Sequence, residues 1–139
     1  MNDNMNDPLK GISLLRDHLL PLLLRDDEQE ILYWAGKDLA RTYDFTSFDD
    51  IKAIMQEVSF GRLELTTQKR STFECRLEGE IIAERLKTNN QATFSMETGF
   101  LAEAIQEVTG HYTEGTYQIM KKSDAVAIEL TFDKHEHYS

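Results

Sequence analysis

The chain has 139 residues, of which 40% are hydrophobic and 29% are charged, and its formal net charge is −10. Length and composition are those of one globular domain spanning residues 1–139, for which we expect flexible tails at 1–8 and 133–139. The acidic excess disfavours nucleic acids and anionic membranes as partners, because phosphate groups are bound by clustered lysine and arginine.

Cys75 is the only cysteine, so the chain cannot form an internal disulfide bond, which is typical of a protein in a reducing compartment. The first eight residues lack the basic and then apolar order of a signal peptide, and the apolar stretch 19–24 is too short to cross a bilayer. We therefore expect a cytoplasmic protein without membrane insertion.

Helical spacing dominates the first half of the chain. Apolar residues within 9–20 predict an amphipathic helix that ends near Pro21, whose missing amide hydrogen disfavours continuation. A second helix is expected to begin after the capping residues Asp26 and Asp27 and to run to about Arg41. Its apolar face is expected to contain Ile31, Leu32, Ala35, Leu39 and Tyr43.

A third helix and a β-hairpin are expected next. Ser47 and Asp50 resemble a capping box that starts the helix, and the alternation within 63–67 and 73–77 predicts the two strands. A short helix at 79–87 follows. The clearest helix, 95–109, ends with a glycine suited to a left-handed C-cap.

A second hairpin closes the chain, with strands around 117–119 and 126–132. Together the elements predict an α/β protein of the α+β type, in which helices pack on a twisted four-stranded antiparallel sheet made of two β-hairpins.

No catalytic pattern is found in the sequence. His135 and His137 could pinch a metal ion, but the terminal polar tail offers no third ligand, and His18 is expected at the boundary of the core. A nucleophile elbow and a glycine-rich phosphate loop are both missing from the sequence. We therefore expect a protein that is not an enzyme and that holds no metal and no cofactor.

Cys75 alternates with apolar residues on the inward face of its strand. We expect it to behave as a small hydrophobic residue, and a reactive or acylated thiol is the alternative. Where this sheet face meets the helix 95–109, an apolar pocket is expected, with a completely filled core as the alternative. Its lining would be Phe73, Cys75, Phe100, Leu101 and Ile105.

Trp34 and Gly99 are the two unusual residues of the helices. Trp34 lies on the flank of its helix, so it either packs against a neighbouring loop or contacts a second protomer through Tyr33, Trp34 and Arg41. Gly99 costs about 1 kcal/mol relative to alanine inside a helix. This cost favours close approach of another element over local flexibility.

The runs ILYWAGKDLAR at 31–41 and FSMETGFLAEA at 94–104, with RLEL at 62–65 and VAIEL at 126–130, resemble the uncharacterised YslB-like family of bacterial proteins. The order of elements is also distantly similar to vinyl-reductase-type sensor domains, haem-dependent nitric-oxide sensors and subunits of the vesicle-tethering transport particle. This resemblance implies helices on a twisted antiparallel sheet that often enclose an apolar ligand cavity.

The chain departs from these relatives in three ways. It lacks the Tyr-x-Ser-x-Arg signature of the haem sensors and the several cysteines of the zinc-containing sensor domains. Cys75 is also not securely matched to the acylated cysteine of the transport-particle subunits.

Two functions are therefore expected as alternatives. The first is a non-enzymatic binding module that holds a fatty or aromatic small molecule between helices and sheet. The second is a homodimeric protein-interaction adaptor with a fully packed core and contacts around Trp34.

Overall fold

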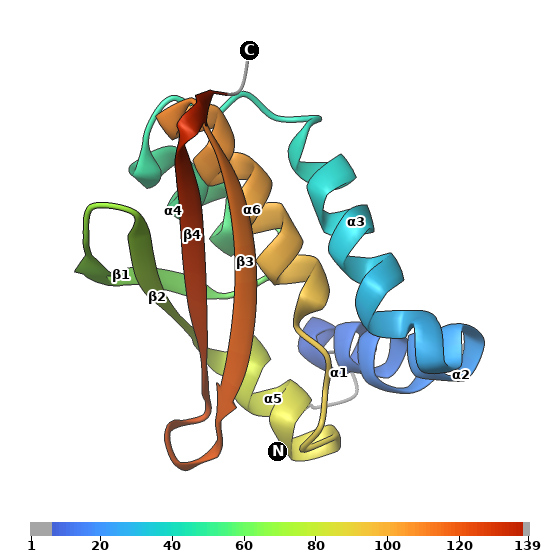
Figure 1. Ribbon diagram of the computed structural model, residues 1–139. Helices are drawn as coiled ribbons and strands as arrows, with labels where there is room; N and C mark the ends of the chain where they lie inside the picture. Colours follow the sequence, from blue (N-terminus) through green and yellow to red (C-terminus); the bar gives the residue numbers. More distant parts are fainter. Residues whose placement is uncertain (1–6, 138–139) are drawn as a thin grey trace.

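A computed structural model describes residues 7–137, with side-chain surroundings for residues 7–133. Helices lie against one face of a four-stranded antiparallel sheet whose strand order is β1-β2-β4-β3 (Figure 1). The strands are β1 (Arg62–Gln68), β2 (Thr72–Glu78), β3 (His111–Met120) and β4 (Ala125–His137). Pairing of β2 with β4 joins the hairpins β1–β2 and β3–β4. The predicted α+β fold with a sheet of two hairpins is confirmed.

Alternation along the strands sorts side chains onto two faces of the sheet. In one row across the sheet Leu65 pairs with Cys75, Cys75 with Ile128, and Ile128 with Tyr117. Cys75 and Ile128 are buried beneath the helices, whereas the next residue of β4, Glu129, is exposed on the other face. The inward position predicted for Cys75 is therefore confirmed.

β4 is longer than predicted. We expected a tail from residue 133, but the strand continues to His137, which pairs with His111 of β3. Backbone pairing needs no apolar alternation, so the polar sequence 133–137 concealed this part of the strand. The side chains of His135 and His137, the weak metal-binding pair of the sequence, lie outside the described residues.

The N-terminal helical segment continues past Pro21. It consists of α1 (Pro8–Leu14), a π-helical turn (Leu15–Leu19) and α2 (Leu20–Leu24). The amide of Leu20 donates to the carbonyl of Leu15 with the five-residue spacing of a π-helix, and Pro21 follows in the first turn of α2. A proline is tolerated there because its missing amide hydrogen leaves no helical bond unmade. The prediction that the helix ends near Pro21 is therefore wrong.

This segment turns much of its apolar side outward. Ser13, Arg16 and Asp17 are buried, whereas five leucines are 41–64% exposed. These leucines are Leu14, Leu15, Leu19, Leu22 and Leu23. His18 is exposed beside them, and not at the core boundary as expected. Polar contacts, not an apolar stripe, therefore hold this part of the segment to the molecule.

No helix among residues 7–137 is long and apolar enough to cross a membrane.

The other α-helices of residues 7–137 are α3 (Glu28–Ala40), α4 (Phe48–Glu57), α5 (Glu80–Thr88) and α6 (Ser95–Thr109), and short 3-10 turns lie at Arg25–Asp27 and Lys121–Ser123. α6 lies between the sheet and α3 (Figure 1). Its end is the one predicted, because Gly110 adopts the left-handed conformation with φ +77°. α6 is buried over most of its length and is the central helix of the fold.

Two glycines allow α3 and α6 to approach closely. A Cβ atom on Gly99 would lie 2.0 Å from the carbonyl oxygen of Tyr33, and one on Gly36 would lie 2.1 Å from the carbonyl oxygen of Met96. No side chain fits at either position without moving the opposite backbone. The close approach predicted for Gly99 is confirmed, and Gly36 is its counterpart on α3.

The same contact sets which face of α3 is buried. Leu32, Gly36 and Ala40 face inward, whereas Ile31 and Leu39 are exposed. The predicted apolar face containing Ile31 and Leu39 is therefore wrong in part. An argument from apolar periodicity gives no weight to a glycine. The contact of Gly36 with α6 nevertheless determines which face of α3 is buried.

Candidate functional site

The five residues expected to line an apolar pocket belong to the hydrophobic core. Cys75, Phe100, Leu101 and Ile105 are buried, and Phe73 is half-buried against the same cluster. The Phe100 ring is packed by other aromatic rings, whose centroids lie 5.3–6.0 Å from its own. None of these five residues lines the pocket described next, which lies beside this cluster.

The environment of Cys75 does not activate its thiol. Burial raises the pKa of Cys75 to about 12, because the interior stabilises a thiolate less than water does. The thiol therefore stays protonated at neutral pH and packs as a small apolar group.

A pocket of about 650 Å³ opens between α3, the N-terminal half of α6 and β3. We call it the α3–α6–β3 pocket. Three segments far apart in the sequence line it: Gln29, Glu30 and Tyr33 from α3, Ser95 and Thr98 from α6, and Glu114, Gly115, Thr116 and Tyr117 from β3. The close packing of α3 on α6 through Gly36 and Gly99 fixes the distance between two of its walls.

One wall of the pocket is organised around Gln29. Its side-chain oxygen Oε1 accepts hydrogen bonds from the hydroxyls of Thr93 at 2.8 Å and Tyr117 at 2.9 Å, and also from the hydroxyl of Ser95. The Tyr117 ring in turn packs edge-on against Phe94, with centroids 6.0 Å apart. Gln29 thus ties the start of α3 to the start of α6 and to the middle of β3.

The opposite wall is organised around Tyr33 and Glu114. The Tyr33 hydroxyl donates to Glu114 Oε1 at 2.5 Å and accepts from the amide of Gly115 at 3.1 Å. Burial, followed by the bond to Glu114, raises the pKa of Tyr33 above its ordinary value. Lys37 lies behind this pair, with Nζ 3.5 Å from Glu114 Oε1 and 5.2 Å from the centre of the Tyr33 ring.

The walls of the pocket present aromatic rings, hydroxyls, one side-chain amide and two carboxylates, and one of these hydroxyls, that of Tyr33, donates to the carboxylate of Glu114. Residues 7–133 also contain no group of three His, Cys, Asp or Glu side chains placed to hold a metal ion.

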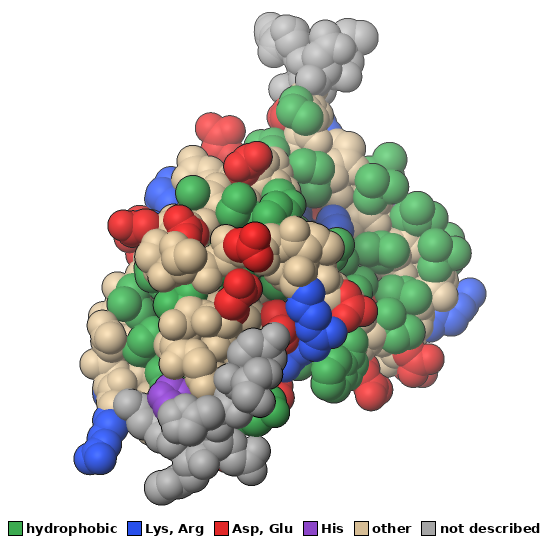
Figure 2. All heavy atoms as spheres, turned by 90° about the horizontal axis from the view of Figure 1, so that it is seen from above, with side chains coloured by type: hydrophobic (Ala, Val, Ile, Leu, Met, Phe, Trp, Pro, Cys, Tyr) green, Lys and Arg blue, Asp and Glu red, His purple; other side chains and the backbone are tan. Residues whose placement is uncertain are grey.

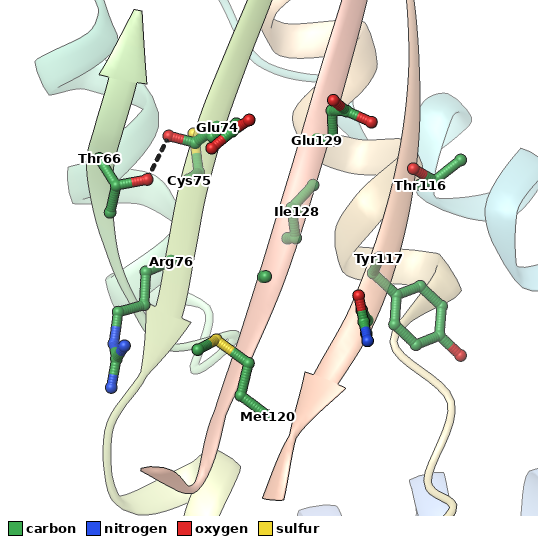
Figure 3. A pocket seen from close by; sticks show the side chains of 11 residues that line it. Thr66, Glu74, Cys75, Arg76, Thr116, Tyr117, Met120, Ile128 and Glu129 are labelled. Carbon is green, nitrogen blue, oxygen red and sulfur yellow. Dashed lines mark hydrogen bonds between the residues drawn. The ribbon is translucent and has the colours of Figure 1, made fainter. Parts of the chain in front are cut away.

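A second hollow, of about 460 Å³, lies on the helix-free face of the sheet (Figure 3). Glu74 and Glu129 stand directly opposite one another on β2 and β4 at one end, and Arg76 and Met120 lie toward the other. Thr66 donates to the backbone carbonyl of Glu74 at 2.9 Å. Charged side chains of both signs, Glu74, Glu129 and Arg76, line this hollow, whereas the charged side chains that line the α3–α6–β3 pocket are acidic.

A buried ionic cluster lies next to the α3–α6–β3 pocket. Arg85 donates to Asp17 at 2.9–3.2 Å, to Glu97 at 3.0 Å and to the carbonyl of Thr93 at 2.6 Å. Arg16 adds two bonds to Glu97 at 2.8 and 2.9 Å. The cluster therefore joins the N-terminal segment to α5 and α6, and through Thr93 it reaches Gln29 in the pocket wall.

The cluster keeps the carboxylate of Glu97 ionised. Burial acts to raise the pKa of Glu97, but the guanidinium groups of Arg16 and Arg85 outweigh it and hold this pKa below its ordinary value. Two arginines and two carboxylates thus compensate one another in a part of the molecule that excludes water.

The residues expected at a dimer contact lie in different surroundings. Trp34 is 55% exposed, and Lys37 Nζ lies 5.4 Å from the centre of its ring. Arg41 bonds to Asp38 at 2.8 Å and to Glu103 at 3.1 Å. Tyr33 is half-buried in the pocket wall. Of the three predicted residues, only Trp34 presents a large apolar surface to solvent.

Exposed apolar side chains extend beyond Trp34. The side of the molecule formed by α3 shows many hydrophobic side chains at its surface (Figure 2). The N-terminal segment carries an apolar groove of about 330 Å³, lined by Leu14, Leu15, His18, Leu19 and Leu22, which we call the leucine groove. An exposed apolar area of this kind is typical of an interaction surface.

Comparison with known proteins gives one family. A family model described as "Protein of unknown function (DUF2507)" matches residues 9–131. "Uncharacterized protein YslB" from Bacillus subtilis strain 168 is 36% identical over 120 residues, which cover 86% of this chain and 81% of that protein. The resemblance to the YslB-like family is confirmed.

Three solved structures show the same fold. A vinyl-4-reductase family protein from Methanocaldococcus jannaschii has a TM-score of 0.63 and 15% identity, and covers 96% of this chain and 98% of its own. The phenol-responsive sensory domain of the transcription activator PoxR, solved with phenol, has a TM-score of 0.63 and 14% identity, and covers 89% and 74%. Subunit 3 of a trafficking protein particle complex from Naegleria fowleri, covalently bound to palmitic acid, has a TM-score of 0.59 and 14% identity, and covers 97% and 98%. At these identities the likeness establishes the fold alone.

Proposed function

Because the chain belongs to the DUF2507 family, whose description assigns no function, we propose one from its own pocket: a non-enzymatic module that binds a small molecule in the α3–α6–β3 pocket. The observation that carries this proposal is the convergence of three distant segments on a pocket of about 650 Å³. This volume lies within the range of sites for small organic ligands, about 300–1,000 Å³.

The walls of the pocket favour a ligand with an apolar body and a polar end. Tyr33 and Tyr117 supply ring surface, while Gln29, Ser95 and Glu114 supply polar atoms whose positions are fixed by hydrogen bonds. A few oriented polar groups on an otherwise apolar wall give a small ligand its orientation.

The structural neighbours support the class of function without identifying the ligand. One neighbour is a sensory domain solved with phenol, and another holds palmitic acid covalently. We do not extend the covalent mode to this chain, because its only cysteine is buried and has a raised pKa. Non-covalent binding in the α3–α6–β3 pocket is the mode that the residues favour.

Native mass spectrometry of the protein purified from its own cells tests this proposal. We expect a retained small-molecule mass in the wild type, and its loss in Gln29→Leu, which removes the acceptor shared by three hydroxyls. Gln56→Leu makes the same change at an exposed site on α4 and should keep the ligand. Wild-type protein without added mass, or equal retention in both variants, contradicts the proposal.

A second function is favoured by a separate observation, the exposed apolar surface. We propose that the protein is a homodimer that uses Trp34 and the leucine groove. The groove lining contains no acidic residue, so two copies can face each other there without pairing like charges, despite the net charge of −10.

Cytoplasmic location remains our expectation for this protein.

Sedimentation of Trp34→Ala tests the dimer. Truncating an aromatic interface anchor costs about 2 kcal/mol of association free energy, which weakens the dimer about 30-fold. The far-ultraviolet circular dichroism should stay unchanged, because the exposed ring of Trp34 contributes little to the fold. A wild type that sediments as a monomer at tens of micromolar rules out this dimer.

A further inference from the structure

We infer that the α3–α6–β3 pocket selects a small ring-bearing ligand that is not an anion and that donates hydrogen bonds, such as a phenol or an aromatic amine. This inference rests on the proposed binding function and defines its ligand class. It is carried by the charge of the lining residues and by the direction of the hydrogen bonds between them.

The charge of the pocket wall is negative. Glu30 and Glu114 line the pocket, and no lysine or arginine is among its lining residues. The basic group behind the wall is Lys37, which is packed over the Tyr33 and Trp34 rings and paired with Glu114 at 3.5 Å. A ligand carboxylate would therefore lie near two negative charges, and the pocket lining offers it no lysine or arginine as a partner.

Four hydroxyl protons of the wall, those of Tyr33, Ser95, Thr98 and Tyr117, already have acceptors within the protein. Ser95 and Tyr117 donate to Gln29 Oε1, and Tyr33 donates to Glu114 Oε1. The Thr98 hydroxyl donates to the carbonyl of Phe94, at 2.8 Å. The groups left for a ligand include acceptors, namely the carboxylate oxygens and the remaining lone pairs of the hydroxyls, and also two donors, the side-chain amide of Gln29 and the hydroxyl of Thr116.

Such a wall pairs best with a donor. A phenol hydroxyl or an ammonium group can donate to Glu114 or Glu30, whereas a ligand carboxylate can only accept and would place a third negative charge beside these two. The rings of Tyr33 and Tyr117 supply the surface on which an aromatic ring can pack. Free fatty acids, which were one of the two ligand types expected from the sequence, fit this wall poorly because they are anionic at neutral pH.

A ring-matched series of probes tests the inference. Phenol, benzylamine and benzoate share one ring and are neutral, cationic and anionic at pH 7. In titrations followed by amide NMR, we expect phenol and benzylamine to shift the signals of Ser95, Gly115 and Tyr117, with benzoate requiring at least about tenfold higher concentration.

Two variants locate the source of the selectivity. Glu114→Gln removes one charge but keeps an acceptor for Tyr33. It should therefore weaken the binding of benzylamine about tenfold and reduce the difference in affinity between phenol and benzoate. Glu129→Gln removes one charge from the helix-free face of the sheet and should leave the order unchanged.

The outcomes separate this inference from the proposed function. If benzoate binds the same amides as tightly as benzylamine, the inference is overturned and the binding function stands. If none of the three probes shifts these amides at millimolar concentration, both are overturned.

Discussion

Replacing Arg85 with methionine should strongly destabilise the protein. Arg85 is 1% exposed and makes five hydrogen bonds, three of them to Asp17. After Arg85→Met, Asp17 would keep the hydrogen bond from Ser13, at 2.9 Å, and Glu97 would keep the bonds from Arg16. Leaving one buried charge without its partner costs about 3–5 kcal/mol. The total stability of a native domain is about 5–15 kcal/mol, so over most of this range the variant should still fold.

Urea unfolding followed by circular dichroism measures this loss. With a slope of about 2 kcal/mol per molar, the midpoint should fall by about 2 M in Arg85→Met. Arg41→Met is the matched control, because Arg41 also pairs with two carboxylates but is 54% exposed, and it should lose less than about 1 kcal/mol. Equal losses in the two variants would refute the view that burial makes the Arg85 cluster structurally important.

Three further predictions concern other parts of the fold. Gly99→Ala should destabilise the protein by roughly 1–3 kcal/mol, because its Cβ would meet the Tyr33 carbonyl. In Gly11→Ala the new Cβ meets no atom within 4 Å, so the free energy of unfolding should rise by up to about 1 kcal/mol. Thermal unfolding measures both changes. A thiol reagent should label Cys75 slowly in native protein and quickly in urea, and Cys75→Ala should cost roughly 1 kcal/mol; rapid native labelling contradicts its burial. The pKa of Glu97 in the folded protein lies below its ordinary value of 4.5. The stabilisation by Glu97 is therefore fully present above pH 4.5 and is lost as the pH falls through the folded-state pKa. The unfolding free energy, measured in urea between pH 6 and pH 3, should accordingly decline less steeply in Glu97→Gln than in the wild type.

Much of the fold could be predicted from the sequence because local patterns decide it. The alternation around Cys75 gave the buried face of β2, and helical spacing with Gly110 gave the end of α6. These patterns involve residues close in sequence. At these positions the local preference and the hydrophobic packing of the whole fold favour the same structure.

The orientation of the N-terminal half could not be predicted in the same way. Apolar spacing placed Ile31 and Leu39 inward, but the backbone contact at Gly36 turned another face of α3 toward α6. In the N-terminal segment, the ion pairs of Arg16 and Asp17 with residues more than 60 positions away outweigh the apolar spacing of the leucines. A count of apolar residues does not detect either contact.

The candidate site was missed for a similar reason. Gln29, Ser95 and Tyr117 meet in space but belong to three segments, and each is an ordinary surface-type residue in its own sequence context. The sequence did indicate a pocket between helices and sheet, yet it placed the lining on residues such as Phe100 and Ile105, which are packed in the core. Only Tyr33 of the predicted contact residues lines the pocket, and it was assigned to a dimer contact.

We propose that a small molecule binds between α3, α6 and β3, and intermolecular nuclear Overhauser effects measure the position of that molecule most directly. With carbon-labelled protein and unlabelled phenol, we predict contacts from the phenol ring protons to the side chains of Tyr33, Thr98 and Tyr117, which line the pocket. Contacts to Phe100 and Ile105 would place the ligand in the core, and contacts to the leucine groove would place it on the surface. Either result would contradict the account.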